Sequence, residues 1–372
     1  MMERAPDVDV GPGVDTPGVS HRRLGETPDA SARMTVFWAE GLPVGHVLTG
    51  SDGVSRTAPK PAQGAARKLQ GAPGTVSVVI CTRDRPGELR RCLSSLPSQT
   101  LAPLEVIVVD NASATGETKA VALEAGVIYV REDRPGLDYA RNTGAAAAHG
   151  DIVAYTDDDV LLHPSWLENM AAAFDAPEVG AVTGLVLPAE LATPAQLHFE
   201  TYWSFGRGYE RKDFTPKAFM ALRNAYPAWE IGAGASMAFR RTVFAAVGGF
   251  DERLDVGRAG CSGDSEFWYR LLAGGYVCRY EPTSVAFHYH RNTEDGLAGQ
   301  LFHYMRGHSA ALLVQFERTG RVGNLKRAFL GLPLRYGRRA LRRSQPRDLY
   351  LEREVRGYLS GLGYYLAGPK RP

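Results

Sequence analysis

The chain has 372 residues, of which 44% are hydrophobic and 23% are charged, as in an ordinary folded protein. This composition excludes a collagen-like repeat, a coiled coil and a chain that is disordered throughout, and the length suggests one large domain with appendages or two domains. A formal net charge of +2 gives no overall field that would favour nucleic acid, so we expect no nucleic-acid partner. Four cysteines without C-x-x-C spacing argue against a disulfide scaffold and a zinc knuckle.

The N-terminal part divides into three pieces before the main domain begins. Residues 1–33 are rich in Pro, Gly, Ser and charge, so we expect a disordered tail. Two strand-like runs within 34–50 predict a small hairpin, and 51–74 has the composition of a linker. Because no apolar run reaches the roughly 20 residues of a spanning helix and the start is unlike a signal peptide, we expect a cytoplasmic protein, or one peripheral at the inner face of a membrane.

From Thr75 onward, short β-branched runs alternate with segments of helical spacing. The runs predict strands at 76–80, 104–109, 127–130 and 151–156. Helices are expected after Pro86 and at 116–125, 137–148 and 165–174. The alternation predicts an α/β fold with a Rossmann-like, mostly parallel sheet flanked by helices, and a ligand site beyond the carboxyl ends of the strands.

Polar residues follow three of these predicted strands. They are Thr82, Arg83 and Arg85 after the first strand, Asp110 after the second, and Asp157, Asp158 and Asp159 after the fourth. Three adjacent carboxylates repel one another, and a divalent cation such as Mg²⁺ or Mn²⁺ would neutralise them. The alternatives are an acidic cluster at the start of the next helix and, for Asp110, a simple turn residue.

The usual phosphate-binding loops are missing from the sequence. No G-x-G-x-x-G follows the first predicted strand, and no G-x-x-x-x-G-K-[ST] occurs anywhere. A nucleotide would therefore be held differently, with a carboxylate such as Asp110 accepting a hydrogen bond from the base or ribose and a metal spanning the diphosphate.

The ordered series of motifs resembles the family 2 glycosyltransferases of the GT-A fold. The motifs are Val76-Ser-Val-Val-Ile-Cys-Thr-Arg-Asp-Arg-Pro, Glu105-Val-Ile-Val-Val-Asp-Asn-Ala-Ser, Gly136-Leu-Asp-Tyr-Ala-Arg-Asn-Thr-Gly, Ala154-Tyr-Thr-Asp-Asp-Asp, Gly232-Ala-Gly-Ala-Ser-Met-Ala-Phe-Arg-Arg, Gly248-Gly-Phe-Asp-Glu-Arg-Leu and Gly263-Asp-Ser-Glu-Phe-Trp-Tyr-Arg-Leu. The resemblance covers about residues 75–290. It implies a GT-A domain at 75–308, with a nucleotide-sugar half at 75–187 and an acceptor half at 188–308.

The resemblance implies an inverting, metal-assisted transfer of a sugar from a nucleoside-diphosphate sugar to a hydroxyl of a glycan, lipid-linked or small-molecule acceptor. Asp157 and Asp159 match the Asp-x-Asp motif, and His288, preferred over His290, is the expected third ligand for Mn²⁺ or Mg²⁺. The donor-binding residues implied are Thr82, Arg83, Arg85, Asp110, Arg141, Asn142, Asp157 and Asp158. Arg141 could instead form a structural ion pair.

The second acidic motif implies the catalytic base. By resemblance this base is Asp264, while Gly263 stands where the family usually has Glu, so the acceptor contact of that Glu is in doubt. We place Glu266, Trp229 and Trp268 on the acceptor side, with a helix first-turn role for Glu266 and packing for the tryptophans as alternatives. The aromatic stretch 197–229 is typical of a binding loop or lid.

Residues 309–372 predict a basic helical region. From Glu317 onward the chain has fourteen Lys and Arg against four acids, interleaved with Leu, Phe and Tyr. Such a helix suits peripheral contact with an anionic membrane, although a solvated face is the simpler alternative. Two other functions stay open: a nucleotidyl- or phosphotransferase of related fold, and a non-catalytic scaffold that binds nucleotide sugars.

Overall fold

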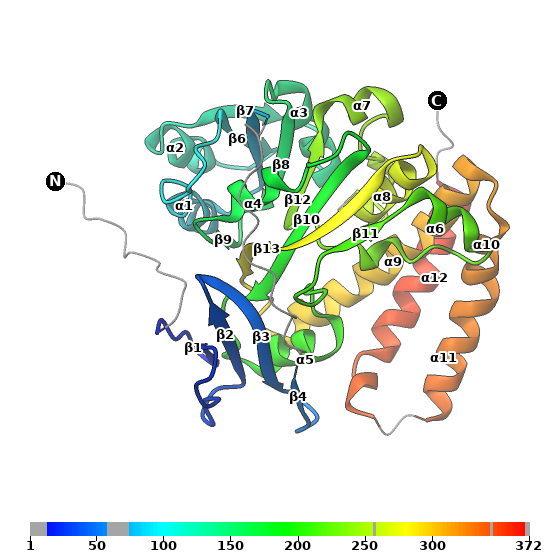
Figure 1. The fold of residues 1–372 in the computed structure, drawn as a ribbon. Coiled ribbons are helices and arrows are strands. Elements are labelled where there is room, and N and C mark those ends of the chain that lie inside the picture. Colours follow the sequence, from blue (N-terminus) through cyan, green and yellow to red (C-terminus); the bar gives the residue numbers. More distant parts are fainter. Residues whose placement is uncertain (1–12, 58–73, 256–257, 343–344, 369–372) are drawn as a thin grey trace.

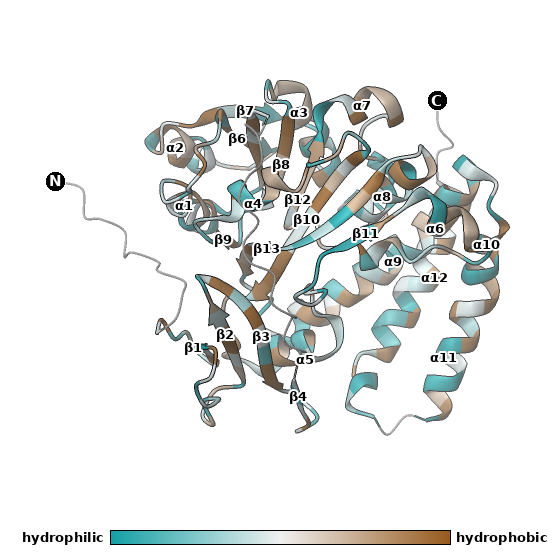
Figure 2. Cartoon of the chain, viewed as in Figure 1, coloured by the Kyte–Doolittle hydropathy of each residue, from teal (hydrophilic) through white to brown (hydrophobic). Residues whose placement is uncertain are grey.

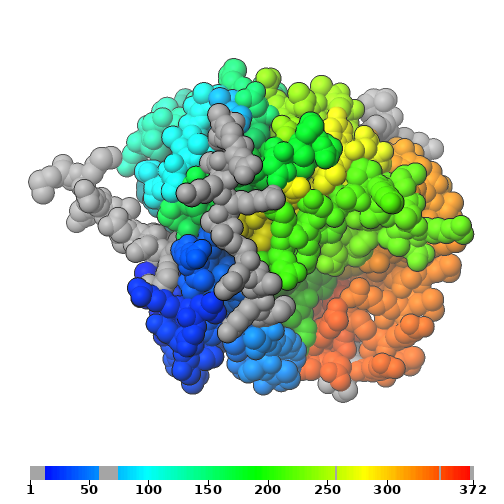
Figure 3. All heavy atoms as spheres, viewed as in Figure 1, coloured from blue at the N-terminus to red at the C-terminus, as the bar shows by residue number. Residues whose placement is uncertain are grey.

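A computed structural model of the chain describes residues 13–57, 74–255, 258–342 and 345–368. The first twelve residues of the tail predicted at 1–33, residues 58–73 of the predicted linker and the last four residues lie outside this range. A large sheet with helices on both faces forms the body, with a small N-terminal sheet at one end and a group of C-terminal helices beside it (Figure 1). In the space-filling view these two additions occupy opposite lower corners (Figure 3).

The large sheet has nine strands in the order β11-β13-β10-β12-β8-β5-β6-β7, and β9 pairs with β13. The strands are β5 (Val76–Thr82), β6 (Glu105–Asn111), β7 (Ile128–Glu132), β8 (Ile152–Asp157), β9 (Val160–Leu162), β10 (Val179–Pro188), β11 (Lys212–Phe214), β12 (Ser236–Arg240) and β13 (Val277–His288). The run β8-β5-β6-β7 is parallel, as the sequence predicts. The other half is mixed, because β12 runs antiparallel to both β8 and β10.

Residues that alternate along the central strands bury opposite faces of the sheet. Val78 and Ile80 of β5 point into one core and Val79 into the other, which is the period of two expected for a strand covered on both sides. Helices α1 (Pro86–Ser94), α2 (Glu117–Glu124) and α4 (Trp166–Ala172) pack on the first face. Helices α3 (Leu137–Ala147), α7 (Arg241–Val247) and α8 (Gly263–Ala273) pack on the second. Strands β8 and β10 are accordingly hydrophobic along most of their length (Figure 2).

The predicted hairpin at 34–50 is part of a four-stranded sheet. Its strands are β1 (Val19–Arg23), β2 (Met34–Ala39), β3 (Leu42–Thr49) and β4 (Ser55–Thr57). Strand β1 falls within the predicted disordered tail, where the structure differs from the prediction. Its order comes from tertiary contacts: Val19 and His21 are buried, and Trp38 Nε1 donates to His21 Nδ1 at 3.0 Å. Trp38 and Val36 pack on Phe287 of β13, which joins the small sheet to the large one.

The aromatic stretch 197–229 is more regular than a loop or lid. It includes most of α5 (Pro194–Trp203) together with β11, α6 (Pro216–Ala221) and a 3₁₀ turn at Ala228–Glu230. Helix α5 starts at a capping box in which Thr193 and Gln196 satisfy each other's backbone N–H groups. A further 3₁₀ turn, Glu252–Leu254, follows α7.

The C-terminal region is helical, as predicted. Its elements are α9 (Glu294–Thr319), α10 (Val322–Lys326), a π-helical turn at Arg327–Gly331, α11 (Leu332–Leu341), a 3₁₀ turn at Pro346–Asp348 and α12 (Leu351–Ala367). The predicted domain boundary at 308/309 falls inside α9, which therefore belongs to both regions. Helix α12 lies directly against α9: a Cβ at Gly357 would meet the Phe302 carbonyl oxygen at 2.2 Å. No helix of the described residues is long and apolar enough to cross a membrane.

Candidate active site

A cavity of about 600 Å³ opens at the carboxyl ends of β5 and β8. Its wall is formed by the loops after these strands, the N-terminal ends of α3 and α8, His288 at the end of β13, and the first half of α9. Nine residues singled out from the sequence line it: Thr82, Arg83, Arg85, Arg141, Asp157, Asp158, Asp159, Asp264 and His288. The parallel strands bring these residues together because their carboxyl ends meet at one edge.

Asp157, at the end of β8, and the two residues after it form an acidic floor for the cavity. Asp158 accepts a hydrogen bond from Thr82 Oγ1 at 2.7 Å and forms an ion pair with Arg85 Nη1 at 2.5 Å. The same Arg85 nitrogen lies 3.0 Å from Asp159 Oδ2. Thr82, the last residue of β5, and Arg85, from the loop after it, therefore tie the end of β5 to the end of β8.

Two of these carboxylates and a histidine have the arrangement of a metal site. Asp157, Asp159 and His288 each place one ligand atom within 4.8 Å of the others, and His288 Nε2 lies 3.3 Å from Asp159 Oδ1. Two carboxylate oxygens and an imidazole nitrogen are a donor set that suits Mn²⁺, and the open cavity beside them leaves room for substrate oxygens and water. The residues present therefore fit a divalent cation.

Desolvation and mutual repulsion raise the pKa values of two carboxyl groups in the acidic floor. Burial, reinforced by the other aspartates, raises the pKa of Asp157 to about 6 and that of Asp158 to about 7. Burial acts the same way on Asp159, but His288 and Arg85 hold its pKa below the ordinary value. Burial lowers the pKa of His288 to about 4, so its ring is neutral at pH 7, the form that binds metal.

Asp264 projects into the opposite wall from the first turn of α8. Ser262, the residue before α8, has φ of 85°, a strained value for a residue other than glycine that directs the start of the helix. A Cβ built on Gly234 would meet both Arg141 Nη2 at 2.7 Å and Asp264 Oδ2 at 2.8 Å, so these two charged groups lie side by side. Arg141 also pairs with buried Asp138, at 3.2 Å.

Steric contact with Asp138 explains why residue 263, in the second acidic motif, is a glycine. A Cβ at Gly263 would come within 2.0 Å of Asp138 Oδ2, so a larger residue is excluded while Asp138 holds this position. Asp138 itself lines the cavity. The space that a side chain at 263 would occupy therefore holds a carboxylate from α3.

Five predicted residues do not line the cavity, and three of them make contacts elsewhere. Asp110 is buried and accepts hydrogen bonds from Tyr129 and Arg131, at 2.8 and 2.9 Å. Asn142 donates its amide to the Phe250 carbonyl at 3.0 Å. Trp229 is half-buried and packs edge-on against His308, with Arg327 over its ring.

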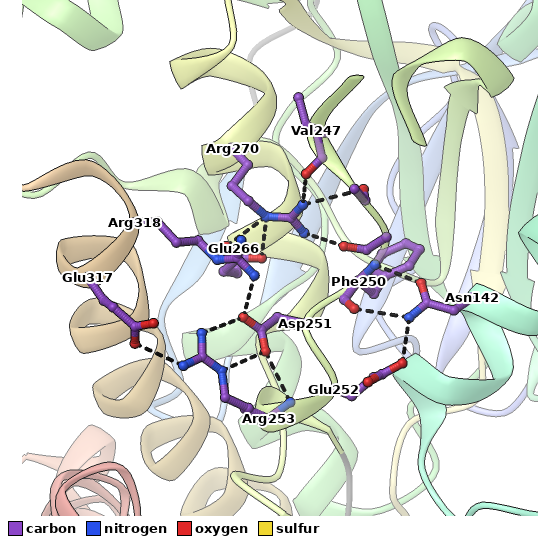
Figure 4. A network of polar contacts seen from close by, with 12 residues as sticks. Asn142, Val247, Phe250, Asp251, Glu252, Arg253, Glu266, Arg270, Glu317 and Arg318 are labelled. Atoms are coloured by element: carbon purple, nitrogen blue, oxygen red, sulfur yellow. Dashed lines mark hydrogen bonds and ion pairs between the residues drawn. The ribbon is translucent and has the colours of Figure 1, made fainter. Parts of the chain in front are cut away.

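Two acceptor-side predictions are corrected by burial. Glu266 is 0% exposed and forms ion pairs with Arg270 Nε at 2.8 Å and Arg318 Nε at 3.2 Å (Figure 4). Trp268 is 1% exposed within the core that α8 shares with the sheet. Both side chains turn inward from α8, where neither can touch an acceptor, so the first-turn and packing alternatives describe them better.

Sequence reasoning also missed residues of the cavity wall. They include Asp138, Arg291, Asp295, Gln300, His303 and Tyr304. The last four lie on the side of α9 that faces the cavity, and their helical spacing was the available signal. Phe205, also in the wall, belongs to the aromatic stretch 197–229 that the sequence singles out as a binding loop. Asp138 and Arg141 are three residues apart on a predicted helix, which would have placed them side by side.

Comparison with known proteins places this geometry in a family. Residues 77–248 match the model described as glycosyl transferase family 2. This part of the chain belongs to that family. The expected α/β class, a sheet flanked by helices, is confirmed by the observed fold.

Curated relatives of this glycosyltransferase family match parts of the chain. A glucosyl-dolichyl phosphate glucuronosyltransferase from Haloferax volcanii is 32% identical, over 50% of this chain and 58% of its own length. A pre-mycofactocin glycosyltransferase from Mycobacterium tuberculosis is 30% identical, over 68% of this chain and 49% of its own length. The matched region thus spans about half of each relative.

Among solved structures, a mannosyltransferase from Pyrobaculum calidifontis in complex with GDP-Man and Mn²⁺ has 18% identity and a TM-score of 0.49, covering 81% of this chain and 91% of that chain.

Proposed function

We propose that the protein is an inverting, cation-assisted glycosyltransferase that moves a sugar from a nucleoside-diphosphate sugar to an acceptor hydroxyl. The observation that carries this proposal is the cavity itself. It brings a cation-type donor set, Asp157, Asp159 and His288, into the same space as the carboxylate of Asp264. Family membership supports the same reaction class.

In this proposal the acidic floor receives the diphosphate end of the donor. Asp157, Asp159 and His288 would hold a divalent cation, Mn²⁺ or Mg²⁺, which when bound neutralises charge on the departing nucleoside diphosphate. Thr82, Arg83, Arg85, Arg141 and Asp158 line the same side and would contact the nucleotide or its phosphates.

Asp110 and Asn142, the two predicted donor-binding residues outside the cavity, have more limited roles in the proposal. Contact between Asp110 and the nucleotide base would require opening its ion pair with Arg131, at 2.9 Å. Asn142 bonds both the carbonyl and the N–H of Phe250, so its part is to fix the loop before the turn 252–254.

Asp264 would act as the general base. A carboxylate can take the proton of an acceptor hydroxyl late in the step, when the oxygen has begun to bond to the anomeric carbon. Attack from the side of α8, with the diphosphate leaving toward the acidic floor, inverts the anomeric configuration. No covalent intermediate on the protein is needed.

The acceptor class is supported by the names of the relatives. One name includes glucosyl-dolichyl phosphate, and the other includes pre-mycofactocin. A lipid-linked or small-molecule hydroxyl acceptor is thus the proposal here, with other glycans as the alternative. The cytoplasmic location expected from the sequence stays a prediction.

The proposal also includes a contact between the C-terminal region and a membrane. The outward face of the π-helical turn and α11 exposes Leu330, Leu334 and Leu341, at 60%, 60% and 90%. No Asp or Glu occurs in the sequence between Arg318 and Arg347, and basic side chains such as Arg338 flank these leucines, although Arg339 pairs with Asp348 and Glu354 from outside this stretch. Exposed leucines beside arginines suit an anionic lipid surface.

Vesicles test the membrane contact. We expect the protein to cosediment with vesicles of phosphatidylglycerol and phosphatidylcholine, and about tenfold less with Leu330→Ser/Leu334→Ser, since each leucine loses its apolar burial. Leu123→Ser on α2, where the leucine is also 60% exposed, is the matched control. Equal binding of all three proteins would remove the membrane from the proposal.

A donor panel tests the activity. UDP-, GDP- and dTDP-sugars with Mn²⁺ are scored for thermal stabilisation and for release of nucleoside diphosphate, and we expect one donor to give both effects. Asp159→Ala should abolish the effects, whereas Asp133→Ala, which removes a side chain that is 86% exposed, should retain them. Release of pyrophosphate instead would favour the nucleotidyltransferase alternative, and binding without turnover would favour the scaffold.

A further inference from the structure

A line of four polar side chains leads from helix α5 to the acidic floor. Glu200 Oε2 lies 3.1 Å from His290 Nε2, and His290 Nδ1 lies 2.9 Å from His288 Nδ1. On its other side, His288 Nε2 lies 3.3 Å from Asp159 Oδ1. His288 is the last residue of β13 and His290 lies two residues after it, while Glu200 approaches His290 from a helix 90 positions earlier in the chain.

The hydrogen bond between Glu200 and His290 determines which atom is the donor in the other hydrogen bonds of the line. Burial acts to raise the pKa of Glu200, but the hydrogen bond from His290 holds it below the ordinary value, so the group is a carboxylate. A carboxylate can only accept hydrogen bonds, and Glu200 already accepts one from Ser204 Oγ at 2.9 Å. His290 must therefore donate from Nε2.

The hydrogen bond between the two histidine rings then determines which nitrogen of His288 carries the proton. A neutral imidazole has one N–H and one lone pair, so a His290 ring with its proton on Nε2 accepts at Nδ1. The proton between the two rings then belongs to His288 Nδ1. The lone pair of His288 is left on Nε2, the atom that faces Asp159.

We propose that Glu200 and His290 are positioning residues that hold His288 in the tautomer able to bind the divalent cation through Nε2. This inference rests on the metal site of the proposed function and assigns it an outer shell. An outer hydrogen bond to the second ring nitrogen is how proteins orient metal-binding histidines. Here the carboxylate acts through a second imidazole rather than directly.

The surroundings protect the relay from water. The side chains of His290 and Glu200 are 2% and 4% exposed. Phe205 packs edge-on against both rings, with centroids 5.1 Å from His288 and 5.8 Å from His290, and Phe199 covers His290 at 4.7 Å. The rings therefore cannot rotate to exchange their nitrogens without displacing two aromatic side chains, and solvent cannot supply a competing proton donor.

The wild-type protein gives the first test without any metal. In ¹⁵N-histidine-labelled, metal-free protein, long-range ¹⁵N–¹H correlation spectra distinguish the two neutral tautomers, and His288→Gln assigns the signals. We expect the His288 proton on Nδ1 and the His290 proton on Nε2. A His288 ring protonated on Nε2 would overturn the inference whatever the activity of the protein.

Two nearly isosteric variants test the consequence for the cation. Asn at 290 places a carbonyl oxygen near the former Nδ1, whereas Leu offers no acceptor, so His290→Asn should bind Mn²⁺ within about threefold of wild type and His290→Leu on the order of 10–100-fold more weakly. Glu200→Leu should behave like His290→Leu. Mn²⁺ alone is titrated by electron paramagnetic resonance, and thermal unfolding verifies that each variant is folded.

The outcomes separate this inference from the proposed function. Equal Mn²⁺ affinity of wild type, His290→Leu and Glu200→Leu overturns the inference and leaves the metal site intact. A wild-type protein that binds no Mn²⁺ overturns the inference together with the metal part of the proposed function. A folded His290→Asn that binds as weakly as His290→Leu also counts against it, because the acceptor at the δ position would then have no effect.

Discussion

Two clusters of acids and arginines meet at helix α8, and their charge balance differs. The paired cluster consists of Asp251, Glu266, Glu317, Arg253, Arg270 and Arg318 (Figure 4). In it, arginine nitrogens lie 2.6–3.2 Å from the carboxylates. The cavity cluster, the charged lining of the cavity, has six aspartates against four arginines: Asp138, Asp157, Asp158, Asp159, Asp264, Asp295, Arg83, Arg85, Arg141 and Arg291.

The difference separates a structural cluster from a ligand site. A buried acid matched by arginine is stable without help from outside the chain, whereas an excess of acids raises their pKa values until a cation arrives. Asp264 and Glu266 stand two residues apart in one motif, yet one belongs to each cluster. Residue type and spacing could not divide them, because the division depends on which side of α8 each one faces.

The largest expected effect is on catalysis at Asp264. We predict that Asp264→Asn lowers turnover of the donor and acceptor by about 10²–10⁴-fold, because the variant cannot accept the acceptor proton. The thermal midpoint should stay close to wild type, since Asp264 is only half-buried and lies in the cavity. Turnover equal to wild type would count against Asp264 as the base.

The paired cluster should respond in the opposite way. Glu266→Leu leaves Arg270 and Arg318 without this carboxylate in a buried site, and we predict a loss of about 3–5 kcal/mol in the free energy of unfolding, measured by chemical denaturation. Glu124→Leu is the matched control, because its ion pair with Arg90 is exposed and should matter by less than about 1 kcal/mol. If both variants unfold alike, the paired cluster is not structural.

The smallest expected effect is a change in pH dependence at Asp158. Its pKa is raised to about 7 in the folded protein, so the folded state holds this proton more tightly than the unfolded chain does. Ionisation between about pH 4 and pH 7 therefore destabilises the metal-free wild type. Asp158→Asn does not titrate, and its free energy of unfolding relative to wild type should rise by about 1–3 kcal/mol over this interval.

Denaturant titrations of both proteins at pH 5 and pH 7 measure this difference, and added Mn²⁺ should reduce it. A constant difference between the two pH values would mean that Asp158 is ionised throughout and that the cavity cluster is as well neutralised as the paired one.

Local patterns predicted the nucleotide-side half well. The runs around Val78, Val108 and Val153 gave β5, β6 and β8, because a strand buried on both faces must be apolar throughout. Their polar ends then located Thr82 and the three aspartates at the cavity. This reasoning needs only short-range sequence.

The remaining parts depend on contacts that are distant in sequence. Strand β1 is ordered by packing on residues that follow it, and Glu200 reaches His290 from across 90 positions. The polar composition around β1 predicts disorder, and the aromatic stretch around Glu200 has no single period. Trp268 could be placed only once α8 had a known inward face.

Helix α9 gives the C-terminal region a role beyond its own fold. Its 26 residues form a rod of about 39 Å, whose first half, with Gln300 and Tyr304, walls the cavity while α12 is wedged against its middle at Gly357 and Gly361. Residues 345–368 thus support this wall of the cavity from outside, through their packing on α9. A change that shifts α12 would therefore also shift the α9 side chains that line the cavity.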